Sequence, residues 1–222
     1  MKGTTVTKKI NFYSVDINLE LNHPQPASKL LPQWFKKLPG VAEGIDTIKK
    51  CMPFLDSMTA GYMLVLAADV YFDGTGVQQI SKQEMVSTHA KSQLGDMQIP
   101  QEYSKQPYKW NNLFLIKTPK GHSTLFTHPM NRIDLPFYTM SGVVETDSFG
   151  LPVNFPFFIK KDFVGVIPAG TPIAQALPFK RADWKHSVED KKQTKLPVYR
   201  FTMHNPPFGF YKKHFWSRKK YQ

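Results

Sequence analysis

Residues 153–179 read VNFPFFIKKDFVGVIPAGTPIAQALPF and contain three short apolar runs. The runs cover Val153–Ile159, Phe163–Ile167 and Ile173–Phe179, and the turn-forming residues PAGTP separate the last two. Short apolar runs rich in phenylalanine and β-branched residues, bounded by proline and glycine, are typical of β-strands. This stretch therefore predicts three successive strands joined by turns.

The same pattern continues toward the N-terminus. Eighteen prolines and thirteen glycines are scattered through the chain and leave no long stretch with a helical period, so helices should be few and short. The run 60–71 is expected to form a buried strand that bends near Ala67. Short strands with regular turns favour an all-β fold, either an antiparallel barrel or a sandwich. The further strands that the pattern predicts are Ile10–Ile17, Leu113–Lys117, Ser123–Thr127 and Met140–Glu145.

Composition excludes several classes of protein. The 222 residues are 41% hydrophobic and 14% aromatic, which suits one domain with a real core and excludes a wholly disordered chain. No apolar run reaches the length of about 18 residues that a membrane helix needs, and the first residues lack the apolar core of a secretory signal, so we expect no membrane contact. The single cysteine, Cys51, excludes an internal disulfide framework and a multi-cysteine zinc site, and favours a reducing compartment.

The net charge of +12 is concentrated near the C-terminus, where residues 180–222 hold twelve basic and three acidic side chains. We therefore divide the chain into a β-barrel body, 1–180, with a polar insertion at about 73–112, and a basic aromatic C-terminal segment, 181–222. Two interpretations of this segment stay open: its aromatic rings dock on its own or a neighbouring body, or it binds nucleic acid. The candidate nucleic-acid-binding residues are Lys212, Lys213, Trp216, Arg218, Lys219 and Lys220.

Four short motifs follow one another along the body. They read TAGYML at 59–64, TPKGHS at 118–123, SGVVETDSFG at 141–150 and GTPIAQAL at 170–177. In this order they resemble the first four motifs of the trimeric dUTPases, a fold shared with the dCTP deaminases, over roughly residues 58–180. The resemblance implies an all-β clip or jelly-roll barrel with few short helices. It also implies a homotrimer with ligand sites at the subunit boundaries.

A second resemblance spans most of the chain. An uncharacterised family of tailed phages and some proteobacteria carries the patterns C-x-P-x-L, P-x-N-R and G-V-V-E-T-D, which are matched here by Cys51–Leu55, Pro129–Arg132 and Gly142–Asp147. This likeness brings no known activity. It implies a phage-type protein that acts in the cytoplasm of an infected host cell or in the virion.

Most of the groups that make a dUTPase catalytic differ in this chain. Glu145 stands where the third motif has its catalytic aspartate, and it is the only candidate catalytic residue. Met63 replaces the first-motif aspartate, and a thioether is a poor ligand for a hard cation such as Mg²⁺. Lys120 and Gly121 replace an Arg-Ser pair, Ser148 replaces a tyrosine, and the glycine-rich fifth motif has no equivalent. The sequence therefore predicts binding without turnover, and Mg²⁺ is expected only if an enzyme activity remains.

The resulting hypothesis is a non-catalytic protein that binds a nucleotide-like or other phosphate-bearing ligand. Two alternatives stay open: a virion or assembly protein that uses the basic C-terminal segment, and a residual nucleotide pyrophosphatase or deaminase. No metal site is expected, since no known ligand spacing is matched. The candidate ligand-binding residues are Lys120, Arg132, Glu145, Asp147 and Gln175.

Each of these candidates also has a structural interpretation. Glu145 and Asp147 would face the same way on a strand, either as a functional pair or as a solvated one. Arg132 could bind phosphate or could fasten its own loop through Asp134. Gln175 interrupts an apolar strand, so its amide must be satisfied by backbone, by a partner subunit or by a ligand.

Overall fold

The computed structural model describes residues 8–15, 23–80, 82–188 and 210–222 of the chain. Its largest sheet has five antiparallel strands, and the four-residue strand β5 and the longer strands β11 and β16 form its centre. The sheet order is β13 (Gly142–Val144), β11 (His122–Thr127), β16 (Pro172–Lys180), β5 (Tyr62–Val65) and β2 (Gln25–Pro26).

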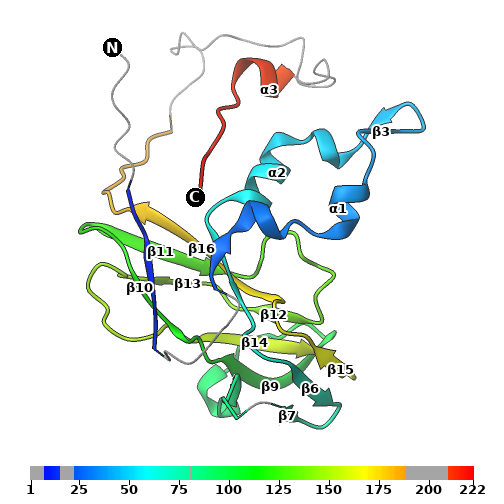
Figure 1. The fold of residues 1–222 in the computed structure, drawn as a ribbon, viewed down its shortest axis with the longest axis vertical. Coiled ribbons are helices and arrows are strands. Elements are labelled where there is room, and N and C mark those ends of the chain that lie inside the picture. Colours follow the sequence, from blue (N-terminus) through cyan, green and yellow to red (C-terminus); the bar gives the residue numbers. More distant parts are fainter. Residues whose placement is uncertain (1–7, 16–22, 81, 189–209) are drawn as a thin grey trace.

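Two further antiparallel sheets pack below this one (Figure 1). The four-stranded sheet has the order β12 (Phe137–Thr139), β14 (Phe155–Lys160), β9 (Tyr103–Trp110) and β8 (Val86–Thr88). The three-stranded sheet has the order β15 (Val164–Ile167), β6 (Val70–Asp73) and β7 (Val77–Gln79). The remaining pairs are β1 (Asn11–Ser14) with β10 (Phe114–Lys117), and β3 (Val41–Ala42) with β4 (Ile45–Asp46).

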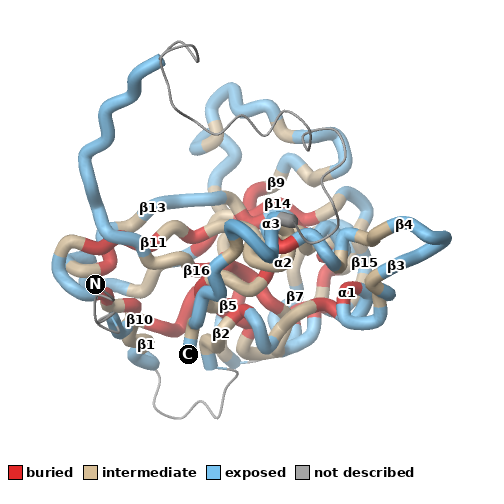
Figure 2. Tube along the Cα trace, turned by 90° about the horizontal axis from the view of Figure 1, so that it is seen from above, coloured by how far each residue is buried: buried red, intermediate tan, exposed pale blue. Residues whose placement is uncertain are grey.

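The core lies between these sheets and is dominated by aromatic rings. Trp110 stacks on Phe157 with ring centroids 3.8 Å apart and planes inclined by 7°, and Phe137 meets Trp110 edge-on at 5.0 Å. Such pairs add to the stabilisation that comes from burying the ring area itself. In Figure 2 the buried residues gather in the middle of the body, whereas the β3–β4 hairpin and the segment after β16 are exposed.

The helices are short, and most of them lie on the outer face of the five-stranded sheet (Figure 1). On this face Met63 and Val65 of β5 pack with Ala27 and Leu30 in a small second cluster. The helical elements are η1 (Ala27–Leu30), α1 (Gln33–Lys37), η2 (Ile48–Lys50), α2 (Met52–Thr59), η3 (Lys91–Leu94) and α3 (Phe210–His214). No helix among the described residues combines the length and the apolar character needed to cross a membrane.

The structure confirms the all-β prediction and the bend in the run 60–71, because β5 ends at Val65 and β6 begins at Val70. The polar insertion expected at about 73–112 instead supplies strands to two sheets. Its strand β9 pairs with β14 and β8, and its Trp110 is fully buried. The sequence did not predict this strand, because Lys105, Gln106 and Lys109 lie between its apolar residues and obscure the strand pattern.

Candidate functional site

The four motif segments meet on the five-stranded sheet. Gly61 leads into β5, the second motif leads into β11, Gly142 opens β13, and Gln175 lies in β16. Strand β11 connects them, because Phe126 pairs with both Gly142 and Ala176, and Thr127 pairs with Gln175. The segments are therefore neighbours in space, although more than 100 residues separate the first from the last.

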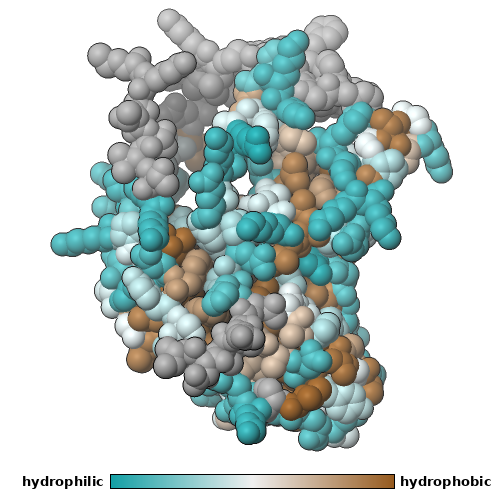
Figure 3. Space-filling model, in the orientation of Figure 1, coloured by the Kyte–Doolittle hydropathy of each residue, from teal (hydrophilic) through white to brown (hydrophobic). Residues whose placement is uncertain are grey.

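The five candidate ligand residues nevertheless divide into two groups at opposite ends of β11. Lys120, Glu145 and Asp147 lie near His122, where the β10–β11 turn and the end of β16 meet, and long hydrophilic side chains stand out from this side in Figure 3. Gln175 lies opposite Thr127, at the other end of β11, and Arg132 lies in the loop that follows Thr127. Six residues of strand span about 17 Å between first and last Cα, so one protomer does not bring the five side chains into one site.

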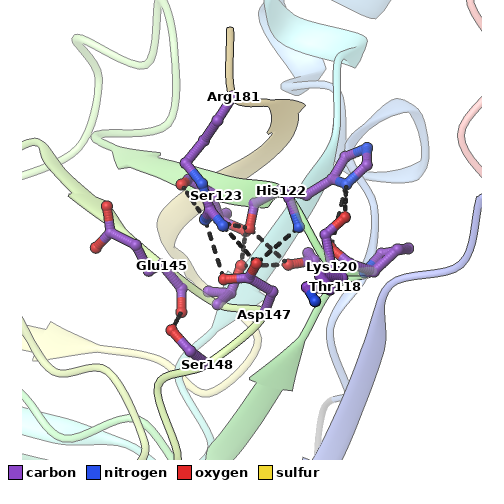
Figure 4. A network of polar contacts seen from close by, with 12 residues as sticks. Thr118, Lys120, His122, Ser123, Glu145, Asp147, Ser148 and Arg181 are labelled. Carbon is purple, nitrogen blue, oxygen red and sulfur yellow. Dashed lines mark hydrogen bonds and ion pairs between the residues drawn. The ribbon is translucent and has the colours of Figure 1, made fainter.

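Asp147 is held within the fold. Its carboxylate accepts hydrogen bonds from Arg181 at 3.0 and 2.5 Å and from the backbone N–H of Gly121 at 2.8 Å (Figure 4). Only 7% of this side chain is exposed. The hydrogen bonds from Arg181 are the main cause that keeps the pKa of Asp147 well below its usual range, so it stays ionised and paired.

Glu145 points away from Asp147 and is exposed (Figure 4). The expectation that the two carboxylates face the same way is wrong, because β13 ends at Val144 and the chain then turns. Thr146 fixes this turn from inside: its buried hydroxyl lies 2.8 Å from the hydroxyls of Thr118 and Thr124. The turn therefore places Thr146 in the buried end of the sheet and leaves Glu145 exposed to solvent.

At the other end, Gln175 is fully buried and satisfied by backbone alone. Its amide nitrogen donates to the carbonyls of Ser57 at 2.8 Å and Ala60 at 2.7 Å, and its amide oxygen accepts from the N–H of Met130 at 2.9 Å. Of the three kinds of partner that the sequence left open, the backbone is the one found. Gln175 thereby joins the end of α2 to the loop that follows β11.

This loop, residues 128–136, is fastened by its own polar side chains. Arg132 donates from Nε and Nη2 to Asp134, in each case at 2.9 Å, which is the structural interpretation given above for this pair. Asn131 has a left-handed backbone with φ of 61° and donates to the hydroxyl of Ser57 at 2.8 Å. The carbonyl of Arg132 lies 3.1 Å from Nε2 of His128. The loop thus holds a defined shape beside the sheet.

A cleft of about 850 Å³ lies between this loop, β12 and β14. Tyr138 stacks on His128 with centroids 5.2 Å apart and planes inclined by 28°, and Tyr103 lies 6.2 Å from Tyr138. The side chains of Arg132 and Lys160 add two cations to the lining. Tyr138 is 44% exposed, so one part of the ring stack is open. Such a site suits a flat ring joined to an anionic group.

Tyr103, Tyr138 and Lys160 were not predicted as site residues. A signal for Tyr138 exists in the sequence, because it stands between Phe137 and Thr139, which are both buried, so the alternation of a strand turns it outward. The sequence does not show that Tyr103 and Lys160 lie opposite one another, which follows only from the register of β9 on β14.

His128 is neutral in this arrangement. The N–H of Thr139 donates to its Nδ1 at 3.2 Å, so Nδ1 carries no proton and Nε2 donates to the carbonyl of Arg132. Burial lowers the pKa of His128 below its ordinary value, and the charges of Arg132 and Lys160 act in the same direction, while Asp134 and the Arg132 carbonyl oppose them. Protonation would therefore break the contact with Thr139.

We expect this histidine to make the protein less stable in mild acid. Because its pKa is lower in the folded chain than the value of about 6.5 in an unfolded one, the unfolded state takes up the proton more readily. The contribution of His128 to the free energy of unfolding should be constant above about pH 6.5 and fall below it, and H128Q should remove that part of the acid sensitivity. Urea unfolding at a series of pH values measures this.

The control for this prediction is H186Q, which changes an exposed histidine in the segment after β16. It should keep the wild-type dependence of stability on pH, because a substitution of an exposed side chain outside the sheets has little effect on the folded state. An unchanged profile in H128Q would refute the assignment of the acid sensitivity to His128.

The C-terminal segment docks on the body at its far end. Nε1 of Trp216 donates to Asp56 of α2 at 2.9 Å, Nζ of Lys219 reaches the same carboxylate at 2.5 Å, and Tyr221 packs edge-on against Tyr62 at 6.0 Å. These contacts agree with the docking interpretation for the aromatic rings, and they also hold Lys219, a candidate nucleic-acid-binding residue, on Asp56. The other candidate nucleic-acid-binding residues, Lys212, Lys213, Arg218 and Lys220, are exposed.

Among the residues that the structure describes, no group of three histidine, cysteine or acidic side chains is placed to hold a metal ion. A scan against protein-family models and a search of curated proteins found no match to this chain.

Proposed function

We propose that this chain is a phage-type protein with a dUTPase-like clip or jelly-roll fold, and that it binds a nucleotide-like ligand without turning it over. In this proposal it forms a homotrimer and acts in the cytoplasm of an infected host cell or in the virion. The finding that supports the fold proposal is the meeting of the four motif segments on one antiparallel sheet. The four segments that meet on this sheet also follow one another along the chain in the order of the dUTPase motifs.

The observation that carries the binding proposal is the combination of an open aromatic stack and two cations in one cleft. A nucleobase can extend the stack on Tyr138, since every base offers a flat face for such contact. Lys160 can meet the phosphate, and among the described residues its ammonium is engaged only by the carbonyl of Ile133 at 3.3 Å. Arg132 uses Nε and Nη2 on Asp134, so the described residues leave Nη1 for an anion.

The proposal that the ligand is not turned over is supported by where the third-motif carboxylates lie, although Glu102 also lines the cleft. Asp147 is neutralised by Arg181, and Glu145 points into solvent at the end of β11 that lies away from the cleft. Asp134, the acidic residue of the cleft loop, is held by Arg132. In one protomer neither candidate of the third motif can activate a water in the cleft, because a general base must come within hydrogen-bonding distance of the group it deprotonates.

Isothermal titration with dUTP, dCTP and cyclic nucleotides tests the proposal. We expect Y138A to weaken the binding of the best ligand about tenfold or more through lost stacking. K160A should also weaken it, by about tenfold, because a phosphate loses its cation. The measurement is the dissociation constant of each variant.

Two neighbours provide matched controls. Lys161 follows Lys160 but does not line the cleft, and Tyr13 is an exposed tyrosine on β1, so K161A and Y13A should bind as the wild type does. If titration with each of these nucleotides gives no heat of binding, the binding proposal is wrong. Chromatography after incubation with Mg²⁺ or Zn²⁺ should recover the nucleotide unchanged, and a product whose formation is lost in E145A would establish the enzyme alternative instead.

A further inference from the structure

The end of the sheet that lies away from the cleft carries lysines and exposed aromatic rings together. We name it the basic aromatic end and define it by Lys8, Lys117, Lys120, Lys180, Phe149, Phe179 and Trp184. These residues come from the approach to β1, the β10–β11 turn, the turn after β13, and the end of β16 with the segment that follows it (Figure 1). Distant parts of the chain therefore meet at this end of the sheet, with Phe179 and Lys180 on its two opposite faces.

Three of its lysines are residues near His122, and one of them contacts the ring. Lys180 lies directly opposite His122 in the register of β11 and β16, and Lys120 precedes it by two residues. Nζ of Lys8 is 2.8 Å from Nε2 of His122. Nδ1 of the same ring lies 3.1 Å from the carbonyls of Pro119 and Lys120, so it carries the proton and Nε2 accepts from Lys8. The ring thus holds the ammonium group of Lys8 in place.

Few negative charges balance these lysines. The four lysines of this end form no ion pair with a described residue; they are Lys8, Lys117, Lys120 and Lys180. The carboxylate of Asp147 is already used by Arg181 and Gly121. Glu145 and Asp183 are the exposed acidic residues nearest in the chain. Lysines spaced over an open surface suit an extended polyanion better than a single small anion, because each ammonium acts as a separate point charge.

The aromatic rings add a second kind of contact. Trp184 is 90% exposed, and Phe149 and Phe179 are each 41% exposed. Two of them adjoin lysines of this end: Phe179 precedes Lys180 in β16, and the carbonyl of Phe149 accepts a hydrogen bond from Nζ of Lys117 at 2.8 Å. Leaving such rings in water is costly, whereas unpaired bases can stack on them.

We propose that the basic aromatic end binds single-stranded nucleic acid, with lysines on the phosphates and Trp184, Phe179 and Phe149 as stacking platforms for the bases. A duplex fits less well, because its bases are already stacked on one another. The surface takes only Trp184 from the C-terminal segment and does not include the last part of that segment, where Trp216 and Lys219 are engaged by Asp56. It is also separate from the cleft, so this proposal does not depend on the proposed function.

Fluorescence anisotropy with a labelled oligodeoxythymidine tests it. We expect binding at low salt that weakens by about 0.7 decades per decade of salt for each phosphate contact. The double variant K120E/K180E should weaken binding more than tenfold and make the salt dependence shallower by roughly one phosphate contact per lysine. The double variant K36E/K37E changes two exposed lysines of α1 by the same net charge, and it should bind nearly as the wild type does.

A further variant separates stacking from charge. W184A keeps every lysine and should weaken binding to the single strand about tenfold, with little effect on the salt dependence. Thermal unfolding of each variant checks that the fold is intact. Three results would overturn the proposal: no binding at low salt, equal losses in the two lysine double variants, or duplex DNA or polyglutamate binding as tightly as the single strand.

Discussion

G61A should be the most damaging single substitution in the sheet, at a cost of about 3–5 kcal/mol in the free energy of unfolding. Gly61 has a φ of +65°, and a Cβ at this position would lie 2.0 Å from the carbonyl oxygen of Ala176. A side chain in the left-handed region costs about 1–3 kcal/mol, and forcing two strands apart costs about as much again. Strand β16 cannot yield easily, because β11 and β5 hold it on both sides. The loss would remove much of the stability of an ordinary domain.

The control isolates the steric part of this effect. Gly44, in the β3–β4 turn, has a similar φ of +76°, but a methyl group added there would have no described atom within 4 Å. G44A should therefore cost only about 1–2 kcal/mol, the conformational part alone. Urea unfolding followed by circular dichroism gives both values. Equal costs for the two variants would show that the close approach of Gly61 to β16 contributes nothing to the loss.

Q175M should be the second large effect, at about 3–5 kcal/mol. Methionine has nearly the volume of glutamine, so no large cavity forms, yet all three hydrogen bonds are lost. The carbonyls of Ser57 and Ala60 and the N–H of Met130 then lose the partner that satisfies them, and an unsatisfied buried group costs about 1–3 kcal/mol. The loop at 128–136 also loses this link to α2 and keeps only the hydrogen bond from Asn131 to Ser57 among the described contacts. We therefore expect weaker nucleotide binding as well as lower stability.

Gln79 offers a matched control. Its amide makes the same kind of backbone contacts, to the carbonyl of Val86 at 2.7 Å and the N–H of Met85 at 3.0 Å, but the residue is exposed. In Q79M, water can replace the lost partners, so the cost should stay below about 1 kcal/mol and binding should not change. Urea midpoints and titration calorimetry measure both properties. A Q175M protein as stable as Q79M would contradict the anchoring role.

The strands were predictable because proline and glycine mark their ends. The run 153–179 gives β14, β15 and β16 within a residue or two, and the break between β5 and β6 falls where Ala67 and Ala68 interrupt the larger apolar residues. Strand β9 was missed because its sequence, YSKQPYKW, is polar on the positions between its buried rings, and a proline stands within it. Its burial depends on partners, β14 and β8, that only the fold supplies.

The site was harder to predict than the strands. The order of motifs places Lys120, Glu145 and Gln175 on one sheet, but it does not tell which end of a strand each side chain occupies. The role of Gln175 depends on carbonyls that lie 115 and 118 residues away in the sequence. The ring stack of the cleft is equally non-local, since Tyr103 and Tyr138 come from the two neighbours of β14. Pairings of this kind carry no signature in a single sequence.

A nucleotide-like ligand should occupy the cleft beside the loop 128–136 and not the end of the sheet that carries Glu145 and Asp147. Chemical-shift mapping by NMR during titration with the nucleotide that binds best tests this directly. We expect the largest changes at His128, Tyr138 and Lys160, with small ones elsewhere. Changes centred instead on residues 118–122 and 145–148, or none at saturating nucleotide, would contradict this placement of the ligand.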